Sequence, residues 1–261
     1  MQSNEPLENT GNSCYSNVCL VVLRYLKPFT NLLLENTWDT TSIKNIEMYK
    51  TIKNLMYTDT SYKDLNNFNK MIQYKYGYQQ QDSFDCLQYI TDQLSTEYDQ
   101  LFELTIEKHI RCDTCSRAKR VEDKCVFLPL ESSTESLLLL QQYNKEYPVD
   151  LTCDHCTSTK ATINESIKSL PTILTYTRPK YIQDIVLLDH IPFDLCLCDT
   201  KYKLQSVVCH IGNIYGGHYV VFVTHDEDNI ICYNDNIAKT VSKKDFQTCA
   251  SKYCSIIFYV S

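Results

Sequence analysis

The chain is predicted to fold as an α+β protein, with helices in roughly its first hundred residues and strands in the remainder. Apolar residues before position 102 recur mostly at spacings of three and four, which is typical of helices that bury one face. Beyond Phe102 the spacing shifts toward two, which indicates strands. Because helices come first and strands follow, the pattern favours the α+β class.

Helices are predicted over residues 14–26, 43–76 and 84–101. The first is almost continuously apolar and stops before Pro28, so it should be buried, with Asn12 or Ser13 as its cap. The second pattern is weaker. The third follows Asp82 and Ser83, which are natural capping residues.

Period-two segments predict strands over residues 102–106, 203–210, 219–223, 230–233 and 255–260. No internal repeat and no obvious long linker interrupts the chain. With 261 residues, of which 43% are hydrophobic, the chain is long enough to bury a substantial core. On length alone, it could form one large domain or two small ones.

Composition disfavours several classes of protein. The net charge of -7 and the pI near 5.4 lack the basic character of a nucleic-acid binder, so a basic partner fits better. No apolar run approaches the roughly 20 residues of a membrane span, and no secretory signal is visible. Fourteen cysteines without an export signal suggest a reducing compartment, where thiols are core residues, metal ligands or catalysts.

Two Cys-x-x-Cys elements form the clearest metal-binding pattern: Cys112 with Cys115, and Cys153 with Cys156. Four thiolates at this spacing can surround Zn²⁺ as a tetrahedron, and a shell without an open position is structural. A thioredoxin-like redox pair is disfavoured by the doubling and by the lack of a βαβ pattern. The remaining alternative is coincidence in a cysteine-rich chain. His155 is left out because the four thiols already complete the shell.

Cys14 is the candidate nucleophile. It follows a loop that contains Gly11 and begins the first predicted helix. The positive end of a helix dipole favours a thiolate, which is the reactive form of cysteine. Cys19 lies one turn further, inside the apolar run, and is expected in the core.

His218 is the candidate base. It follows Gly216 and Gly217 and precedes a predicted strand, so it should stand at the rim of a sheet. The next strand ends at Asn234 and Asp235, either of which could orient an imidazole. Cysteine, histidine and Asn or Asp form a protease triad, although a histidine before a strand is often only structural.

These segments resemble the sequence boxes of the ubiquitin-specific proteases. Residues 7–17, Leu-Glu-Asn-Thr-Gly-Asn-Ser-Cys-Tyr-Ser-Asn, are similar to the family's cysteine box. Further matches, in the family's order, are residues 80–87, the paired cysteines, residues 170–174 with Arg178, residues 210–223 with 233–235, and residues 255–259. The matches cover nearly the whole chain.

The resemblance implies a papain-like cysteine protease shaped as a right hand. Its single catalytic domain would comprise a helical thumb over residues 1–101, zinc-binding fingers over 102–170 and a β-rich palm over 171–261. Ubiquitin would rest on the fingers, with its tail between thumb and palm. We expect ubiquitin and ubiquitinated proteins as partners, no nucleic acid or membrane, a monomer, and a cytoplasmic or nuclear location, in a host cell if the gene is viral.

The resemblance also implies catalytic roles. Cys14 would attack the carbonyl of the terminal glycine, and His218 would take the thiol proton and later protonate the leaving lysine amine. Asn234 aligns with the residue that orients the histidine, and Asp235 contends for that role. Asn9 aligns with the side-chain donor of the oxyanion hole, the alternative being a residue that only caps a turn.

Five further residues are expected near the substrate tail. Asp82 and Asp85 could pair with ubiquitin's arginines, although they could equally be plain helix N-terminal charges. Gly216 and Gly217 would line the narrow passage for the Gly-Gly tail, with Tyr219 next to them.

The sequence departs from the family pattern in several places. The chain is short, so loops must be trimmed. Pro179 follows Arg178 where Phe is usual, and Ile231 and Cys232 replace a tryptophan. Cys86 replaces an aromatic residue and is expected in the core. The remaining thiols are expected in the core or on the surface: Cys196, Cys198, Cys209, Cys249 and Cys254.

Three alternatives stay open at the level of sequence. The chain could bind ubiquitin without cutting it, but Cys14, His218 and Asn234 are all present. It could act on a different modifier with a Gly-Gly tail. It could be a zinc-ribbon module for nucleic acid, which the acidic charge disfavours.

Overall fold

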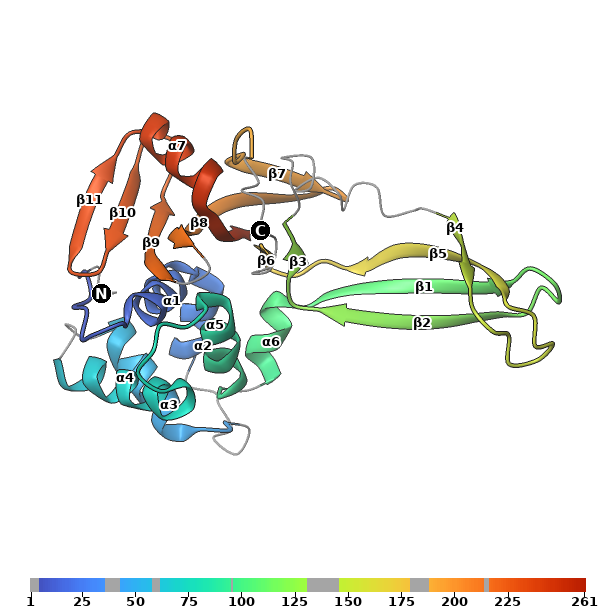
Figure 1. Ribbon diagram of the computed structural model, residues 1–261, viewed down its shortest axis with the longest axis horizontal. Coiled ribbons are helices and arrows are strands. Elements are labelled where there is room, and N and C mark those ends of the chain that lie inside the picture. The colour runs from blue at the N-terminus through green and yellow to red at the C-terminus, as the bar shows by residue number, and fades with distance from the viewer. Residues whose placement is uncertain are drawn as a thin grey trace.

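A computed structural model describes residues 5–35, 43–57, 62–94, 96–130, 146–178, 188–213 and 216–261. Helices gather in the first part of the chain, and strands make up most of the rest (Figure 1). The predicted α+β class is therefore confirmed. The helices are α1 (Cys14–Tyr25), α2 (Lys27–Leu34), α3 (Ile46–Tyr57), α4 (Tyr62–Tyr76), α5 (Ser83–Asp92), α6 (Thr96–Phe102) and α7 (Lys243–Tyr253).

The strands form two sheets. A four-stranded antiparallel sheet has the order β2-β1-β5-β4 and extends away from the helices as a long arm (Figure 1). Its strands are β1 (Leu104–Cys112), β2 (Ala118–Cys125), β4 (Glu146–Asp150) and β5 (Lys160–Ser169).

The larger sheet has the order β11-β10-β9-β8-β12-β6-β3, and β7 pairs with β8. Its strands are β3 (Leu128–Pro129), β6 (Ile173–Thr177), β7 (Asp194–Leu197), β8 (Thr200–Asn213), β9 (Gly216–Thr224), β10 (Ile230–Asn234), β11 (Ile237–Val241) and β12 (Cys254–Val260). Strand β3 belongs to this sheet through its parallel pairing with β6. The segment 102–170 therefore contributes to both sheets.

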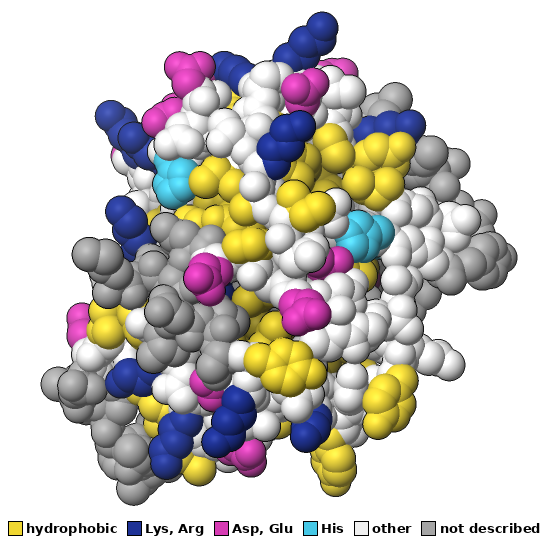
Figure 2. All heavy atoms as spheres, turned by 90° about the vertical axis from the view of Figure 1, so that its left-hand side faces the viewer, with side chains coloured by type: hydrophobic (Ala, Val, Ile, Leu, Met, Phe, Trp, Pro, Cys, Tyr) yellow, Lys and Arg dark blue, Asp and Glu magenta, His cyan; other side chains and the backbone are white. Residues whose placement is uncertain are grey.

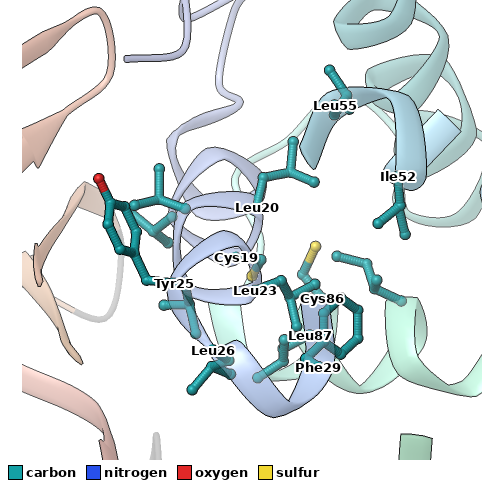
Figure 3. Packing of buried hydrophobic residues seen from close by; sticks show 14 of the residues in the cluster. Cys19, Leu20, Leu23, Tyr25, Leu26, Phe29, Ile52, Leu55, Cys86 and Leu87 are labelled. Atoms are coloured by element: carbon teal, nitrogen blue, oxygen red, sulfur yellow. The ribbon is translucent and has the colours of Figure 1, made fainter. Parts of the chain in front are cut away.

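Helix α1 is the centre of the larger core. All twelve of its residues are buried, which explains why its sequence is apolar on nearly every side. Figure 3 shows Leu20 and Leu23 of α1 among residues from α3 and α5, including Leu55 and Leu87. Each fully buried leucine stabilises the fold by about 2 kcal/mol. This packing fixes the position of the residue that begins α1, Cys14.

The third predicted helix is divided in the structure. Helix α5 ends at Asp92 and α6 begins at Thr96, so the prediction of one helix over 84–101 is wrong at its middle. The backbone carbonyls of Gln93 and Leu94 accept from the N–H groups of Asn45 and Lys44, at 2.9 Å each. Because a tertiary contact takes these carbonyls, the helical ladder stops there.

Helix α2 was not predicted. Pro28 ends the apolar run, but it lies in the first turn of α2, where its missing N–H has no cost.

Among the described residues no single helix is long and apolar enough to cross a membrane. Helices α1 and α2 meet that test only jointly, across a 77° bend.

Candidate active site

Cys14 is the first residue of α1 and is 1% exposed. The loop before it turns sharply, because Gly11 and Asn12 have φ of 98° and 52°. Ser13 stands at the N-cap position, but its hydroxyl makes no capping bond to the helix. The hydroxyl instead donates to Asn9 Oδ1 at 3.2 Å, so the predicted side-chain cap is replaced by a bond within the loop.

The Cys14 thiol lies in an environment that opposes ionisation overall. Burial raises its pKa most, and the nearby Asp235 carboxylate raises it further. The backbone N–H groups of Tyr219, Tyr15 and Cys14 itself act in the opposite direction without cancelling the effect of burial. A thiol of this kind needs a neighbouring base before it can attack.

His218 and Asn234 are joined by a hydrogen bond. His218 lies on β9 and Asn234 ends β10, and His218 Nε2 is 2.7 Å from Asn234 Oδ1. Since Nε2 is engaged by the amide oxygen, Nδ1 is the ring nitrogen left for proton exchange. The next residue of β9, Tyr219, has its backbone N–H at the Cys14 sulfur. The strand that carries His218 therefore runs directly past the Cys14 thiol.

Asp235 has a different set of partners. Its carboxylate accepts from Asn9 Nδ2 and from Asn17 Nδ2, both at 2.9 Å. Its backbone oxygen accepts from Leu7 N at 3.1 Å, whereas His218 Nε2 lies 3.8 Å from Oδ2. Asp235 thus joins the end of β10 to the segment before α1.

The Asn9 side chain is held at both ends. Its Oδ1 accepts from the backbone N–H groups of Gly11 and Ser13, at 3.0 and 3.3 Å, while its Nδ2 donates to Asp235. An amide nitrogen carries two hydrogens, and Asp235 uses one of them. The orientation of Asn9 is therefore fixed by the loop and by β10.

The four cysteines of the two Cys-x-x-Cys elements meet at the far end of the long arm. Their sulfur atoms lie within 4.8 Å of one another, with 3.6 Å between Cys112 and Cys156 and 3.7 Å between Cys115 and Cys153. A tetrahedron with Zn–S bonds of about 2.3 Å has edges of about 3.8 Å. The donor set and its spacing fit Zn²⁺, and His155 lies outside the group.

The two knuckles have the same backbone form. Ser116 and Thr157 each have φ of 58°, and each donates its N–H back to the first cysteine of its pair. The backbone N–H groups of Cys156 and His155 lower the pKa of Cys153 to about 6, which favours the thiolate that binds metal.

The family model for ubiquitin carboxyl-terminal hydrolases matches residues 6–259. The chain belongs to this family. The resemblance to ubiquitin-specific proteases in the sequence boxes is thereby confirmed.

The curated relatives of this chain are distant and longer. "Probable ubiquitin carboxyl-terminal hydrolase 8" of Schizosaccharomyces pombe is 21% identical over 253 residues, covering 83% of this chain and 56% of that protein. "Ubiquitin carboxyl-terminal hydrolase 42" of Homo sapiens is 22% identical, covering 97% of this chain and 22% of that protein. The chain spans about half, or less, of their length.

Solved structures share the fold. A SAGA DUB module of Ubp8, Sgf11, Sus1 and Sgf73 bound to monoubiquitin contains a chain with a TM-score of 0.76 and 20% identity, covering 100% of this chain and 71% of that one. The corresponding module bound to ubiquitin aldehyde gives a TM-score of 0.74 at 20% identity. At this identity the likeness shows the fold, and it confirms the thumb, palm and fingers architecture for this chain.

Two of the expected substrate-binding residues lie at the start of α5. Asp82 is its N-cap, and its carboxylate accepts from the backbone N–H groups of Phe84 and Asp85, at 2.7 and 3.4 Å. Asp85 is exposed in the first turn. Asp82 therefore has the structural role given above as its alternative, as a residue at the start of a helix. A role in substrate binding stays a prediction for Asp82 and Asp85.

The other expected substrate-binding residues, Gly216, Gly217 and Tyr219, lie at the start of β9.

The sequence analysis missed two residues that contact the candidate site. Asn17 holds Asp235, and Gln80 hydrogen-bonds to Gly217. Both lie inside boxes that resemble the family's, which is the signal that could have found them.

The remaining cysteines have the expected positions. Those predicted in the core are buried, Cys19 at 2% exposure and Cys86 at 0%. Cys209 and Cys254 are buried, Cys249 is half-buried, and Cys196 and Cys198 are exposed. The position of Pro179 lies outside the described residues.

Figure 2 shows the end of the molecule opposite the long arm, where histidine and acidic side chains lie next to one another at the surface. His218 and Asp235 have side-chain exposures of 38% and 12%. The His218 side chain is thus accessible from the surface, while the Asp235 carboxylate, which holds the N-terminal loop, is largely covered.

Proposed function

We propose that this chain is a deubiquitinase that hydrolyses the peptide or isopeptide bond after the C-terminal glycine of ubiquitin. The observation that carries the proposal is the arrangement of three residues: His218 is held by Asn234 at 2.7 Å on the strand whose next N–H meets the Cys14 sulfur. This arrangement supports acyl transfer to a thiol.

In the first half-reaction His218 Nδ1 takes the proton of the Cys14 thiol. The thiolate attacks the carbonyl carbon, and the electron pair of the C=O bond moves to oxygen. When the tetrahedral intermediate collapses, the C–N bond breaks and the lysine amine leaves with the proton from His218. The product is a thioester between Cys14 and the glycine.

In the second half-reaction a water molecule attacks the thioester while His218 accepts its proton. The C–S bond breaks, the glycine carboxylate leaves, and the proton returns to the sulfur. Asn234 orients the imidazole through Nε2 in both halves, which keeps Nδ1 directed at the reaction.

Asn9 would stabilise the oxyanion with its second Nδ2 hydrogen, together with the backbone N–H of Cys14. Its fixed orientation supports this role, because Asp235, Gly11 and Ser13 hold the amide before substrate arrives. Loss of such a donor raises a barrier by about 3 kcal/mol.

The four cysteines would hold a structural Zn²⁺, which cross-links the two knuckles at the end of the arm when bound. The globular body of ubiquitin would rest on this arm, and its tail would enter between the helices and the larger sheet. In this proposal residues 1–101, 102–170 and 171–261 serve as thumb, fingers and palm of a monomer.

The test uses ubiquitin with a thiol-reactive group at its C-terminus. The purified chain should form a covalent adduct that Cys14→Ala abolishes and that the surface variant Cys196→Ser retains. Absence of an adduct with the native chain would overturn the proposal. The same reaction with other Gly-Gly modifiers decides whether ubiquitin is the preferred substrate.

A further inference from the structure

The start of β9 has one edge that no strand covers among the described residues. Strand β10 pairs with β9 only from Val221 to Thr224, while β8 pairs along the opposite edge as far as Gly216. An uncovered strand edge presents backbone donors and acceptors to any extended chain that reaches it.

The Gln80 side chain occupies this edge. It lies in the connection between α4 and α5, and its Nε2 donates to the Gly217 oxygen at 2.7 Å. The Gly217 N–H donates to Gln80 Oε1 at 3.2 Å. One amide side chain therefore satisfies both backbone groups of Gly217, as a neighbouring strand would.

The edge leads directly to the nucleophile. The backbone N–H of Gly217 points at Gln80 and therefore away from β8. In a strand, the backbone N–H groups of residues two apart point to the same side. Tyr219 is two residues further, about 7 Å along the strand, and its N–H meets the Cys14 sulfur. A chain that pairs with Gly217 would therefore bring its next residues to the thiol.

Two positions of the β8–β9 hairpin leave no room for a side chain. A Cβ at Gly217 would lie 2.5 Å from His210 Nε2 and 2.8 Å from the Ile211 oxygen, so no side chain fits at this position. A Cβ at Gly212, its partner on β8, would lie 2.4 Å from the Gly217 Cα. Because these contacts all lie within the β8–β9 hairpin, Gly217 presents only its backbone groups at the uncovered edge.

We propose that Gln80 is a specificity-determining residue that occupies the substrate's pairing edge in the free enzyme and must turn away before an extended tail can bind. The inference rests on the proposed function for the identity of the tail. A ligand that displaces Gln80 must replace its two hydrogen bonds to Gly217. An extended backbone can do so, whereas a ligand without matching donor and acceptor groups is disfavoured.

Binding measurements separate this role from an ordinary substrate contact. In a Cys14→Ala background, Gln80→Ala should tighten the Kd for ubiquitin about 3- to 10-fold, the size expected for two exposed hydrogen bonds. In the active enzyme KM should fall by a similar factor, with kcat within about twofold. Gln79→Ala, at the exposed neighbour, should change neither quantity. Weaker or unchanged binding by Gln80→Ala would overturn the proposal.

Hydrogen exchange at the Gly217 amide reports on the contact without any substrate. Gln80→Ala should speed this exchange in the free protein at least about threefold, and Gln79→Ala should not. Unchanged exchange would overturn the proposal even if the enzyme is active. If the native chain neither binds nor cleaves ubiquitin, the proposed function fails, while the exchange result still decides whether Gln80 covers the edge.

Discussion

The arm that carries the four-cysteine cluster and the candidate catalytic cleft around Cys14 are built in opposite ways. The arm is a four-stranded sheet made from residues close in sequence, and β2 is exposed along almost its whole length. The cleft joins distant parts of the chain, since Asn9 and Asp235 are 226 positions apart. The arm ends in a local cluster of four cysteines and carries surface ion pairs, whereas the cleft is held by hydrogen bonds around a buried helix.

This difference predicts different failures. Lys108 bridges β2 and β5 through Asp123 and Glu165, at 2.6 and 3.2 Å, but exposed pairs of this kind contribute little stability. The arm should therefore depend on its metal. The cleft rests on the core around α1, so its weak points are individual polar groups and not its packing.

The largest effect is expected from removing the metal. Cys153→Ala should lower bound zinc from one per chain to nearly none and cost the arm on the order of 10 kcal/mol of local folding free energy. Hydrogen exchange over residues 104–169 measures that loss. The rate of Cys14 alkylation in Cys153→Ala should stay within about twofold of the native rate. The control variant His155→Ala should keep its zinc. A collapse of Cys14 reactivity would show that arm and cleft form one unit.

The pH dependence of Cys14 alkylation tests the cleft next. Burial raises the pKa of this thiol, so without a base it is protonated at neutral pH and its thiolate increases about tenfold per unit as pH rises. In His218→Ala the alkylation rate should therefore climb about 100-fold between pH 7 and 9. The ratio of the Cys14 alkylation rate in the native chain to that in the variant should be largest at pH 7. Mass spectrometry of the Cys14 peptide measures both alkylation rates. A rate that stops rising below pH 8 in His218→Ala would contradict the assignment of His218 as the base.

Replacing Asn234 and Asp235 separately sharpens the distinction between chemistry and architecture within the cleft. Asn234→Ala should lower kcat about 10- to 100-fold with little change in Tm. Asp235→Ala removes the carboxylate that accepts from both the Asn9 and Asn17 amides, so it should cost about 2 kcal/mol and lower Tm by about 4–8 °C, as well as lowering kcat. The reverse pattern would make Asp235 the residue that orients His218.

The smallest expected effect concerns Asp82, where structure and substrate binding overlap. Asp82→Asn retains a good N-cap but removes the charge, so Tm should be unchanged while KM rises up to about fivefold if the carboxylate meets ubiquitin's arginines. Asp82→Ala should additionally lose about 1 kcal/mol of stability. An unchanged KM in Asp82→Asn would leave Asp82 with its capping role alone.

Much of the fold could be predicted from local pattern. The spacing of Cys112, Cys115, Cys153 and Cys156 fits the observed cluster because a knuckle is a short-range backbone turn. The start of α1 at Cys14 was predicted correctly for the same reason. The break between α5 and α6 could not be predicted, since residues 44 and 45 cause it from a distant part of the chain.

The sequence alone determined the candidate residues: Cys14, His218 and the Asn234–Asp235 pair, in that order, for the chemistry, and four cysteines for a metal ion. Only the tertiary structure decided how the neighbours divide their roles. It places Asn234 on the imidazole, Asp235 on Asn9 and Asn17, and Gln80 on the edge of β9. The physical reason is range: spacing governs backbone geometry over a few residues, whereas these contacts depend on how β9, β10 and α1 pack together.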